Sequence, residues 1–171
     1  RLAARKGYGS LLRAFAQVNQ KNPETKLLIV GRGSLKKRLV KQAKRLGISS
    51  SVRIDSGMPF DKLAEEFRNA DLVVYPSYYE GQGLIPLEAM ASGTPVATVN
   101  HGPLPEMVDD SVGALFTMAD TDSMSSAILS LLDNPEGLVT RGTTGRERVL
   151  KNFTFGQNAE DFSQIYSQLA N

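Results

Sequence analysis

The chain has 171 residues, a length that fits one domain with one hydrophobic core. Hydrophobic residues make up 41% and charged residues 22%, which excludes a disordered or low-complexity protein. Twenty basic and 18 acidic residues leave a net charge of +2, too small to indicate nucleic-acid binding. The chain has no cysteine and one histidine, His101, which excludes disulfides and argues against thiolate or histidine-rich metal sites.

Short β-branched runs alternate with longer amphipathic stretches. The runs are typical of strands buried in a parallel sheet and lie at 26–30, 52–56, 71–76, 95–99 and 113–116. Helical patterns fall at 11–18, 35–46, 63–70 and 84–91. This alternation predicts an α/β fold, a Rossmann-like, doubly wound, mostly parallel sheet with helices on both faces.

Three helical patterns without strands follow, at 123–132, 135–150 and 155–169, and predict a helical C-terminal tail. The chain opens on a basic loop and a helix, where such a sheet normally opens on a strand. We therefore predict a single domain over 1–171 and expect a preceding first strand to lie outside this sequence.

The stretch 75–96, YPSYYEGQGLIPLEAMASGTPV, carries the strongest functional pattern. After the predicted strand comes a loop with Gly81 and Gly83, and the helix that follows has Pro86 in its first turn, where proline is tolerated. Glycines before a helix let backbone N–H groups approach a ligand, and a helix N-terminus favours anions. Ligands of open α/β sheets bind beyond the carboxyl ends of the strands, so the pattern indicates a phosphate site.

Two carboxylates, Glu80 and Glu88, flank this predicted phosphate site. Carboxylates repel phosphate but accept hydrogen bonds from hydroxyl groups. A diphosphate with hydroxyls on both sides describes a nucleotide sugar, and Arg1 and Lys6 in the opening loop are cations that a diphosphate needs. The competing interpretation is that all four residues are ordinary solvated charges.

These motifs resemble the C-terminal, donor-binding domain of the retaining nucleotide-sugar glycosyltransferases called group 1, or family 4, which have the GT-B fold. The family's two glutamates separated by seven residues match Glu80-GQGLIPL-Glu88, and EAMASGTPV follows at 88–96. Its Gly-Arg…Lys-Gly element matches from Arg1 to Lys6-Gly7 without the first glycine. Its Gly-x-Gly turn matches 31–33, and its Gly-Gly-x-x-Glu element survives as GPLPE at 102–106. The resemblance covers about 1–120 in register, and the three tail helices fit it too.

The resemblance implies residue roles. Arg1, Lys6 and Glu80 would be the catalytic group, in which the two cations neutralise the diphosphate and Glu80 holds hydroxyls of the donor sugar. Glu88 would hold the ribose diol. The other donor-binding residues would be Gly81, Gln82, Gly83, Leu84, Ile85, Gly31, Gly33, Met58 and His101. Gln82 replaces the family's usual aromatic residue, and a lone loop histidine such as His101 is more often a surface residue than a ligand contact.

The resemblance also implies a UDP-, GDP- or ADP-sugar donor, with no cofactor and no metal. Transfer of a hexose to a hydroxyl acceptor (a glycan, lipid or small molecule) would keep the anomeric configuration. It would require the acceptor-binding N-terminal domain, which this sequence lacks, so we expect the isolated chain to bind donor and to be inactive.

Two rival functions stay open from the residues alone. A glycoside hydrolase would use Glu80 and Glu88 as acid and base, but it leaves the glycines between them and the Arg1–Lys6 pair unexplained. A non-catalytic nucleotide-binding α/β module predicts nucleotide affinity that is indifferent to the sugar.

The helix predicted at 35–46 carries six cations and no acid. One interpretation is peripheral contact with anionic lipid head groups, and the other is a solvated helix face. The predicted partners are a nucleotide sugar and an acceptor, without nucleic acid, and only the first interpretation of this helix adds a membrane surface. The predicted location is the cytoplasm, extending to the inner face of the membrane.

Overall fold

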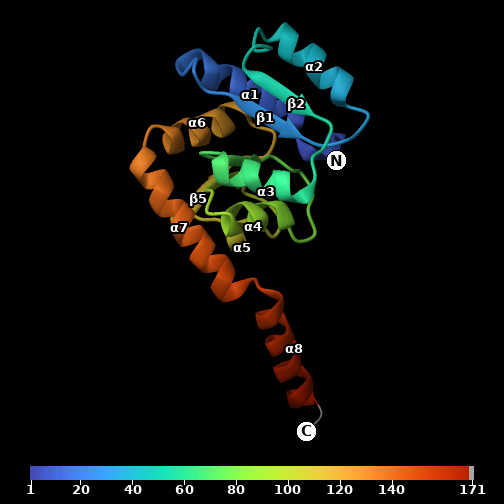
Figure 1. Ribbon diagram of the computed structural model, residues 1–171, viewed down its shortest axis with the longest axis vertical. Coiled ribbons are helices and arrows are strands. Elements are labelled where there is room, and N and C mark those ends of the chain that lie inside the picture. The colour runs from blue at the N-terminus through green and yellow to red at the C-terminus, as the bar shows by residue number, and fades with distance from the viewer. Residues whose placement is uncertain (170–171) are drawn as a thin grey trace.

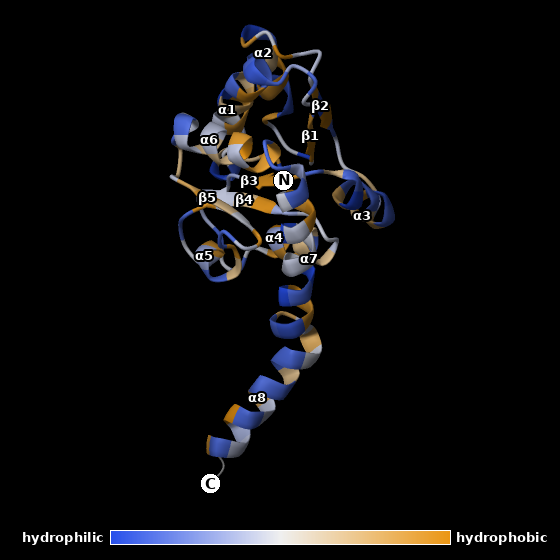
Figure 2. Ribbon diagram, turned by 90° about the vertical axis from the view of Figure 1, so that its left-hand side faces the viewer, coloured by the Kyte–Doolittle hydropathy of each residue, from blue (hydrophilic) through white to orange (hydrophobic). Residues whose placement is uncertain are grey.

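Short parallel strands lie at the centre of the computed structural model, which describes residues 1–169 (Figure 1). They are β1 (Leu27–Val30), β2 (Val52–Asp55), β3 (Val73–Tyr75), β4 (Val96–Val99) and β5 (Gly113–Phe116). Figure 2 shows that hydrophobic residues concentrate in these strands. Every residue of β4 is buried, as expected for an apolar strand covered on both faces.

A helix follows each strand, and further helices complete the chain. They are α1 (Tyr8–Lys21), α2 (Lys36–Arg45), α3 (Phe60–Asn69), α4 (Leu84–Ala91), α5 (Leu104–Met107), α6 (Thr121–Leu132), α7 (Pro135–Asn152) and α8 (Phe155–Leu169), after a short 3₁₀ turn η1 (Ala4–Lys6). α1 packs against α6, and α4 packs against α7. The predicted α/β class is confirmed, as is each predicted strand and helix, whereas the sequence patterns missed η1 and α5.

The strands form two sheets within the described residues. β1 pairs with β2 in parallel, with Leu27 opposite Val52, and β3, β4 and β5 pair in parallel in that order. β1 and β3 are not hydrogen-bonded to each other. One core nevertheless spans both sheets, because Ile29 of β1 and Val99 of β4 belong to the same buried cluster as Leu12 of α1.

The first seven residues join the two sheets at the carboxyl ends of their strands. The Leu2 N–H donates to the Arg32 carbonyl after β1 at 2.8 Å, and the Tyr78 N–H after β3 donates to the Arg5 carbonyl at 2.7 Å. Gly7 approaches the Pro76 carbonyl so closely that a Cβ on Gly7 would lie 2.0 Å from that oxygen. This close packing places Lys6 beside the loop that follows β3.

Helix α8 extends away from the rest of the domain in both Figure 1 and Figure 2. It has no buried residue, although it carries several large apolar side chains. These exposed residues are Phe155, Phe162, Ile165, Tyr166 and Leu169. Among residues 1–169, no helix combines the length and the apolar character that crossing a bilayer requires.

Candidate donor site at the carboxyl ends of the strands

The loop between β3 and α4 is shaped by Gly83, which precedes the first residue of α4. Gly83 has a φ of +83°, and a Cβ there would lie 2.7 Å from Cδ2 of Leu104, so only glycine fits without rearrangement. No side chain of residues 1–169 caps α4. Backbone N–H groups of its first turn are therefore not used by a side-chain cap, and the phosphate site that the sequence pattern indicates at this point stays a prediction.

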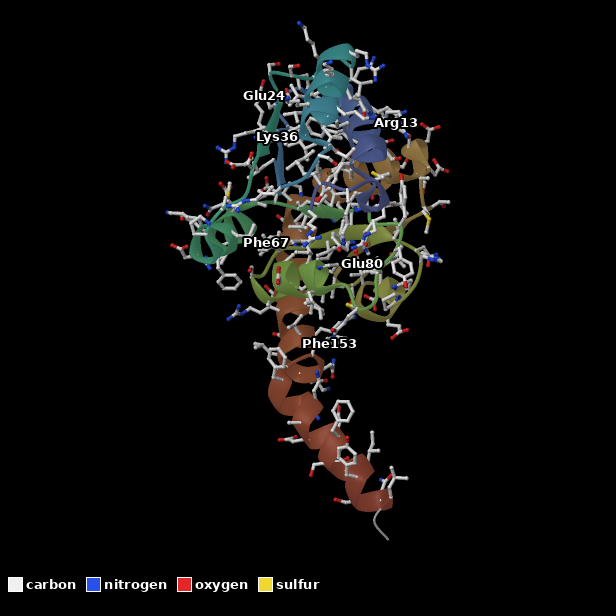
Figure 3. The ribbon with its side chains drawn as sticks, turned by 90° about the vertical axis from the view of Figure 1, so that its right-hand side faces the viewer. Arg13, Glu24, Lys36, Phe67, Glu80 and Phe153 are labelled. Atoms are coloured by element: carbon white, nitrogen blue, oxygen red, sulfur yellow. The ribbon has the colours of Figure 1, made fainter. Side chains whose placement is uncertain are left out.

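Glu80 lies in the same loop (Figure 3) and is the centre of a hydrogen-bonded cluster. One carboxylate oxygen, Oε1, is paired with the Lys6 ammonium and accepts hydrogen bonds from the Tyr75 and Ser77 hydroxyls, both at 2.6 Å. Lys6 also donates to the Tyr75 hydroxyl at 2.9 Å. The Lys6 and Glu80 side chains are largely buried, at 15% and 13% exposed, so this ion pair is poorly screened by solvent.

Burial and hydrogen bonding act in opposite directions on Glu80. Burial raises the pKa of its carboxyl, but the hydrogen bonds from Lys6, Ser77 and Tyr75, with the charge of Lys6, leave that pKa below its usual value. Burial and then the adjacent Glu80 carboxylate raise the pKa of the Tyr75 hydroxyl far above its usual value. At neutral pH the cluster therefore holds an ionised carboxylate beside a neutral phenol.

Residues 81–83, with Gly81 and Gly83, form the glycine loop between Glu80 and α4. Glu88 lies on α4, beyond this loop, in a different environment. Its side chain is half-buried, and no hydrogen bond or ion pair of its carboxylate occurs within residues 1–169. Burial therefore raises the pKa of the Glu88 carboxyl with nothing to offset it. This carboxylate is available to accept hydrogen bonds from ligand hydroxyls.

The loops after the other strands line up along the same edge. Gly31 and Gly33, after β1, pack against Leu2, and a Cβ on Gly33 would lie 2.3 Å from the Leu2 carbonyl oxygen. Met58 is half-buried after β2. His101 is exposed after β4, and a Cβ on the adjacent Gly102 would lie 4.0 Å from the Glu80 carbonyl oxygen.

The structure thus brings together Lys6, Glu80, the start of α4 and the His101 loop. Arg1 is exposed in the N-terminal segment, and none of the hydrogen bonds and ion pairs in the described chain involves its side chain. In the glycine loop and α4, Gly81, Gln82 and Leu84 are exposed, and Ile85 is half-buried. The roles assigned to these residues stay predictions.

Sequence reasoning missed Tyr75 and Ser77, which both bind Glu80. Ser77 lies three residues before Glu80, and Tyr75 ends β3, so both were near a strand end where ligand-binding groups gather. A search for hydroxyl side chains at that strand end could have found them. Within residues 1–169, no group of three or more histidine, aspartate or glutamate side chains could hold a metal ion.

The parallel strands with helices between them define a Rossmann-like α/β domain. The family model described as glycosyl transferases group 1 matches residues 1–148, and the chain belongs to this family. Its solved relatives have the GT-B fold, and the chain corresponds to their C-terminal domain.

Three relatives illustrate the similarity. Glycogen synthase of Mycobacterium tuberculosis (strain CDC 1551 / Oshkosh) is 30% identical over 97% of this chain and 40% of its own length. Staphylococcus aureus TarM, solved with UDP among its ligands, is 26% identical with a TM-score of 0.88 over 97% of this chain and 34% of its own. The C-terminal domain of a group 1 protein from Francisella tularensis is 25% identical with a TM-score of 0.82, over 91% of this chain and 83% of its own.

The chain therefore spans about two fifths of the length of the first curated relatives that it matches. Only the separately solved Francisella tularensis domain is of comparable length among the three. The sugar-transfer class follows from the family, whereas the activity of a whole protein containing this chain is a matter for proposal.

Proposed function

We propose that this chain is the donor-binding domain of a retaining glycosyltransferase that uses a nucleoside diphosphate sugar without a metal ion. The observation that carries this proposal is the Lys6–Glu80 ion pair, which lies close to the start of α4, where the backbone accommodates only glycine at position 83. The ion pair holds a cation of the N-terminal segment against a carboxylate of the β3–α4 loop, the loop that leads to the uncapped N–H groups of α4. Membership of the group 1 family and the UDP complex of TarM support it.

In this proposal the diphosphate lies against the start of α4. Arg1 and Lys6 neutralise its charge, and the N–H groups of Gly83 and Leu84 bind its distal phosphate. Glu88 accepts hydrogen bonds from the ribose diol, and Glu80 accepts them from the transferred hexose. The base lies against the loops containing Gly31, Gly33 and Met58, while Gly81, Gln82, Ile85 and His101 complete the donor site.

Transfer breaks the bond between C1 of the sugar and the diphosphate, while the acceptor oxygen bonds to C1 on the same face. Negative charge then develops on the leaving diphosphate, and the acceptor proton is released. Lys6, Arg1 and the start of α4 stabilise that charge, which lowers the barrier because the interaction is strongest in the transition state.

Lys6 has two partners in this proposal. Before donor binds, its ammonium is neutralised by Glu80, which avoids burying an isolated charge. A bound diphosphate offers a stronger anionic partner and draws Lys6 toward it. Glu80 is then free of its strongest donor and can accept hydrogen bonds from the sugar.

The acceptor, a glycan, lipid or small molecule, would bind a preceding N-terminal domain. The unpaired edges of β1 and β3 support a further strand between them, which would give the strand order of a doubly wound sheet. The exposed apolar residues of α8 support packing against that second domain. The isolated chain would then bind donor without turning it over.

One observation favours the hydrolase alternative. The pKa of the Glu80 carboxyl is lowered and that of the Glu88 carboxyl is raised, as in a pair of carboxyl groups that act as base and acid. That alternative still leaves the Lys6–Glu80 pair and the glycine loop without a purpose. A hydrolase requires no nucleotide, so donor binding separates the two functions.

Calorimetric titration tests the proposal directly. The chain is titrated with UDP, GDP and ADP and with a glucose or mannose ester of each. One nucleotide family should bind, and its sugar ester should bind more tightly than the plain diphosphate. Equal affinity for both would favour a non-catalytic nucleotide module, and binding of glycosides without any nucleotide would favour a hydrolase.

We also propose that the full protein acts in the cytoplasm and contacts the inner face of the membrane through α2. A surface groove along this helix is lined by basic side chains and by no acidic one: Lys37, Arg38, Lys41, Lys44 and Arg45. Anionic vesicles should bind the chain and neutral vesicles should not. Replacing Lys37, Lys41 and Lys44 with glutamate should abolish sedimentation with the vesicles, and unchanged sedimentation would contradict this contact.

A further inference from the structure

The Tyr75 hydroxyl lies between the two charged groups of the proposed donor site. It accepts a hydrogen bond from Lys6 Nζ at 2.9 Å and donates one to Glu80 Oε1 at 2.6 Å. The Lys6 ammonium also lies 5.2 Å from the centre of the Tyr75 ring. No role was assigned to Tyr75 from the sequence, yet its hydroxyl contacts both residues proposed to act on the donor.

The hydrogen bonds divide the two oxygens of Glu80. Oε1 accepts hydrogen bonds from Lys6, Tyr75 and Ser77, whereas no hydrogen bond or ion pair in the described chain involves Oε2. A carboxylate has about four lone-pair sites, so Oε1 is saturated and Oε2 is open. The cluster therefore fixes one edge of the carboxylate and leaves the other edge for a ligand.

Tyr75 is itself held firmly. It ends β3, is 8% exposed, and its carbonyl accepts a hydrogen bond from the buried Thr98 hydroxyl at 2.9 Å. A phenol has a rigid ring and few rotatable bonds, so its hydroxyl loses little freedom when it forms a hydrogen bond. Lysine, in contrast, has a flexible stem that can swing toward a phosphate.

We propose that Tyr75 is a positioning residue whose hydroxyl holds Glu80 in place, with Oε2 open to the donor sugar, when the diphosphate draws Lys6 away. Ser77 alone would fix Oε1 through one bond and would allow the carboxylate to rotate. With Tyr75 present, two hydroxyls on different residues keep the carboxylate in one orientation. This inference rests on the proposed function and concerns the sugar contact within it.

The test compares two ligands in one variant. Tyr75→Phe keeps the buried ring and removes the hydroxyl. The extra affinity of the nucleotide sugar over its nucleoside diphosphate should fall by about tenfold, a loss in the range of one hydrogen bond to a charged group. Affinity for the plain diphosphate should change less than about twofold, because Tyr75 does not contact it.

Tyr78→Phe is the matched control. Its hydroxyl bonds to Ser10 Oγ at 2.7 Å and not to Glu80, so its removal should leave the extra affinity for the sugar unchanged. A double-mutant cycle with Glu80→Gln makes the test sharper. Tyr75 should act through Glu80, so Tyr75→Phe should cost almost nothing more once Glu80 is glutamine.

Other outcomes would overturn the proposal. Equal losses for diphosphate and nucleotide sugar would show a merely structural role, and independent losses in the cycle would show that Tyr75 does not act through Glu80. A further measurement uses the unmutated chain, so it stays informative even if Tyr75→Phe fails to fold. With nucleoside diphosphate bound, the Tyr75 hydroxyl should exchange slowly, giving separate Cζ resonances in mixed H2O and D2O, and one averaged resonance would contradict the proposal.

Failure of the proposed function has a different signature. If no nucleotide of the panel binds, the donor-site assignment fails. Separate Cζ resonances in a chain that binds no nucleotide would then show a Tyr75–Glu80 hydrogen bond that serves stability alone, which would overturn the positioning role as well.

Discussion

The two ends of the glycine loop hold the same residue type in opposite environments. Glu80, before the loop, has three hydrogen-bond donors on one oxygen, and the pKa of its carboxyl is lowered. Glu88, beyond it, has no such partner among the described residues, and burial raises the pKa of its carboxyl. The comparison shows that the spacing of the two glutamates in the sequence reveals a pair of carboxylates, but not which of them is hydrogen-bonded or in which direction the pKa of each is shifted.

The difference follows from what surrounds each residue. Glu80 faces the N-terminal segment, where Lys6 is held by the packing of Gly7 on Pro76. Glu88 lies on a helix whose neighbours Leu87, Ala89 and Met90 are buried in an apolar cluster. In the proposed donor complex, Glu80 therefore exchanges Lys6 for the sugar, whereas Glu88 gains a hydrogen-bond partner from the ribose.

The largest expected effect concerns Lys6, because it bears the charge at the Glu80 end. Lys6→Ala should weaken nucleoside diphosphate binding by about 1.5–3 kcal/mol, the range for charged hydrogen bonds, and the loss should shrink as salt rises. Calorimetric titration at low and high salt measures it. Lys62→Ala, which removes an exposed lysine paired with Glu65, is the control and should have no effect. An equal loss for the nucleoside without phosphates would contradict a phosphate contact.

The second prediction separates the two glutamates directly. Glu88→Gln should weaken nucleoside diphosphate and nucleotide sugar alike, because both carry the ribose. Glu80→Gln should weaken the nucleotide sugar and leave the plain diphosphate nearly unchanged. Each loss should be about 1–3 kcal/mol if the hydroxyl hydrogen bonds are charge-assisted. Titration of both variants with both ligands tests this, and equal losses in every combination would make both glutamates structural.

The sequence predicted the fold from local patterns that the structure retains. The helix predicted at 84–91 has those bounds in the structure. Gly83 precedes its first residue and Ser92-Gly93 follows its last, so both signals that delimit the helix are adjacent to it in the sequence. The strands were recognisable because buried parallel strands are continuous apolar runs. α5 was missed because a helix of one turn has no periodicity to detect.

The site was only partly accessible to sequence reasoning. The order Glu80, glycine loop, Glu88 is local and was visible. The pairing of Lys6 with Glu80 joins residues 74 positions apart, and it depends on how the first residues pack on both sheets. The pairing therefore could not be read from spacing, nor could the consequence that one oxygen of Glu80 is saturated and the other open.

A smaller effect concerns the pH dependence of folding stability, which should distinguish the two glutamates in the absence of any ligand. The pKa of Glu80 is lower in the folded chain, so its contribution to stability is present above its unfolded pKa of about 4.3 and is lost as pH falls through its folded pKa. The pKa of Glu88 is higher in the folded chain, so stability instead falls as pH rises from about 4.3 through its folded pKa.

Thermal unfolding of the two variants across pH 3–7 measures this difference, the pH range being set by the unfolded pKa of about 4.3. Near pH 7, Glu80→Gln should lower Tm and Glu88→Gln should leave it unchanged or raise it. The gap should close at the acid end. A change of about 1 kcal/mol corresponds to roughly 2–4 °C for a chain of this size, which is the upper end of what we expect. Parallel curves for both variants would show that the two environments do not differ.

The smallest expected effect is that of metal removal, and it asks whether either carboxylate serves a cation instead of a sugar. The chain has an Asp-x-Asp pattern at 120–122, but Asp120 accepts hydrogen bonds from the Asp122 and Ser123 N–H groups and so caps α6, while Asp122 accepts one from Gln17. At the proposed donor site, Lys6, Arg1 and the start of α4 would supply the positive charge. EDTA should therefore leave nucleotide-sugar affinity unchanged within error. A loss that magnesium or manganese restores in the parent chain, but not in Glu88→Gln, would make Glu88 a metal ligand and would end its assignment to the ribose.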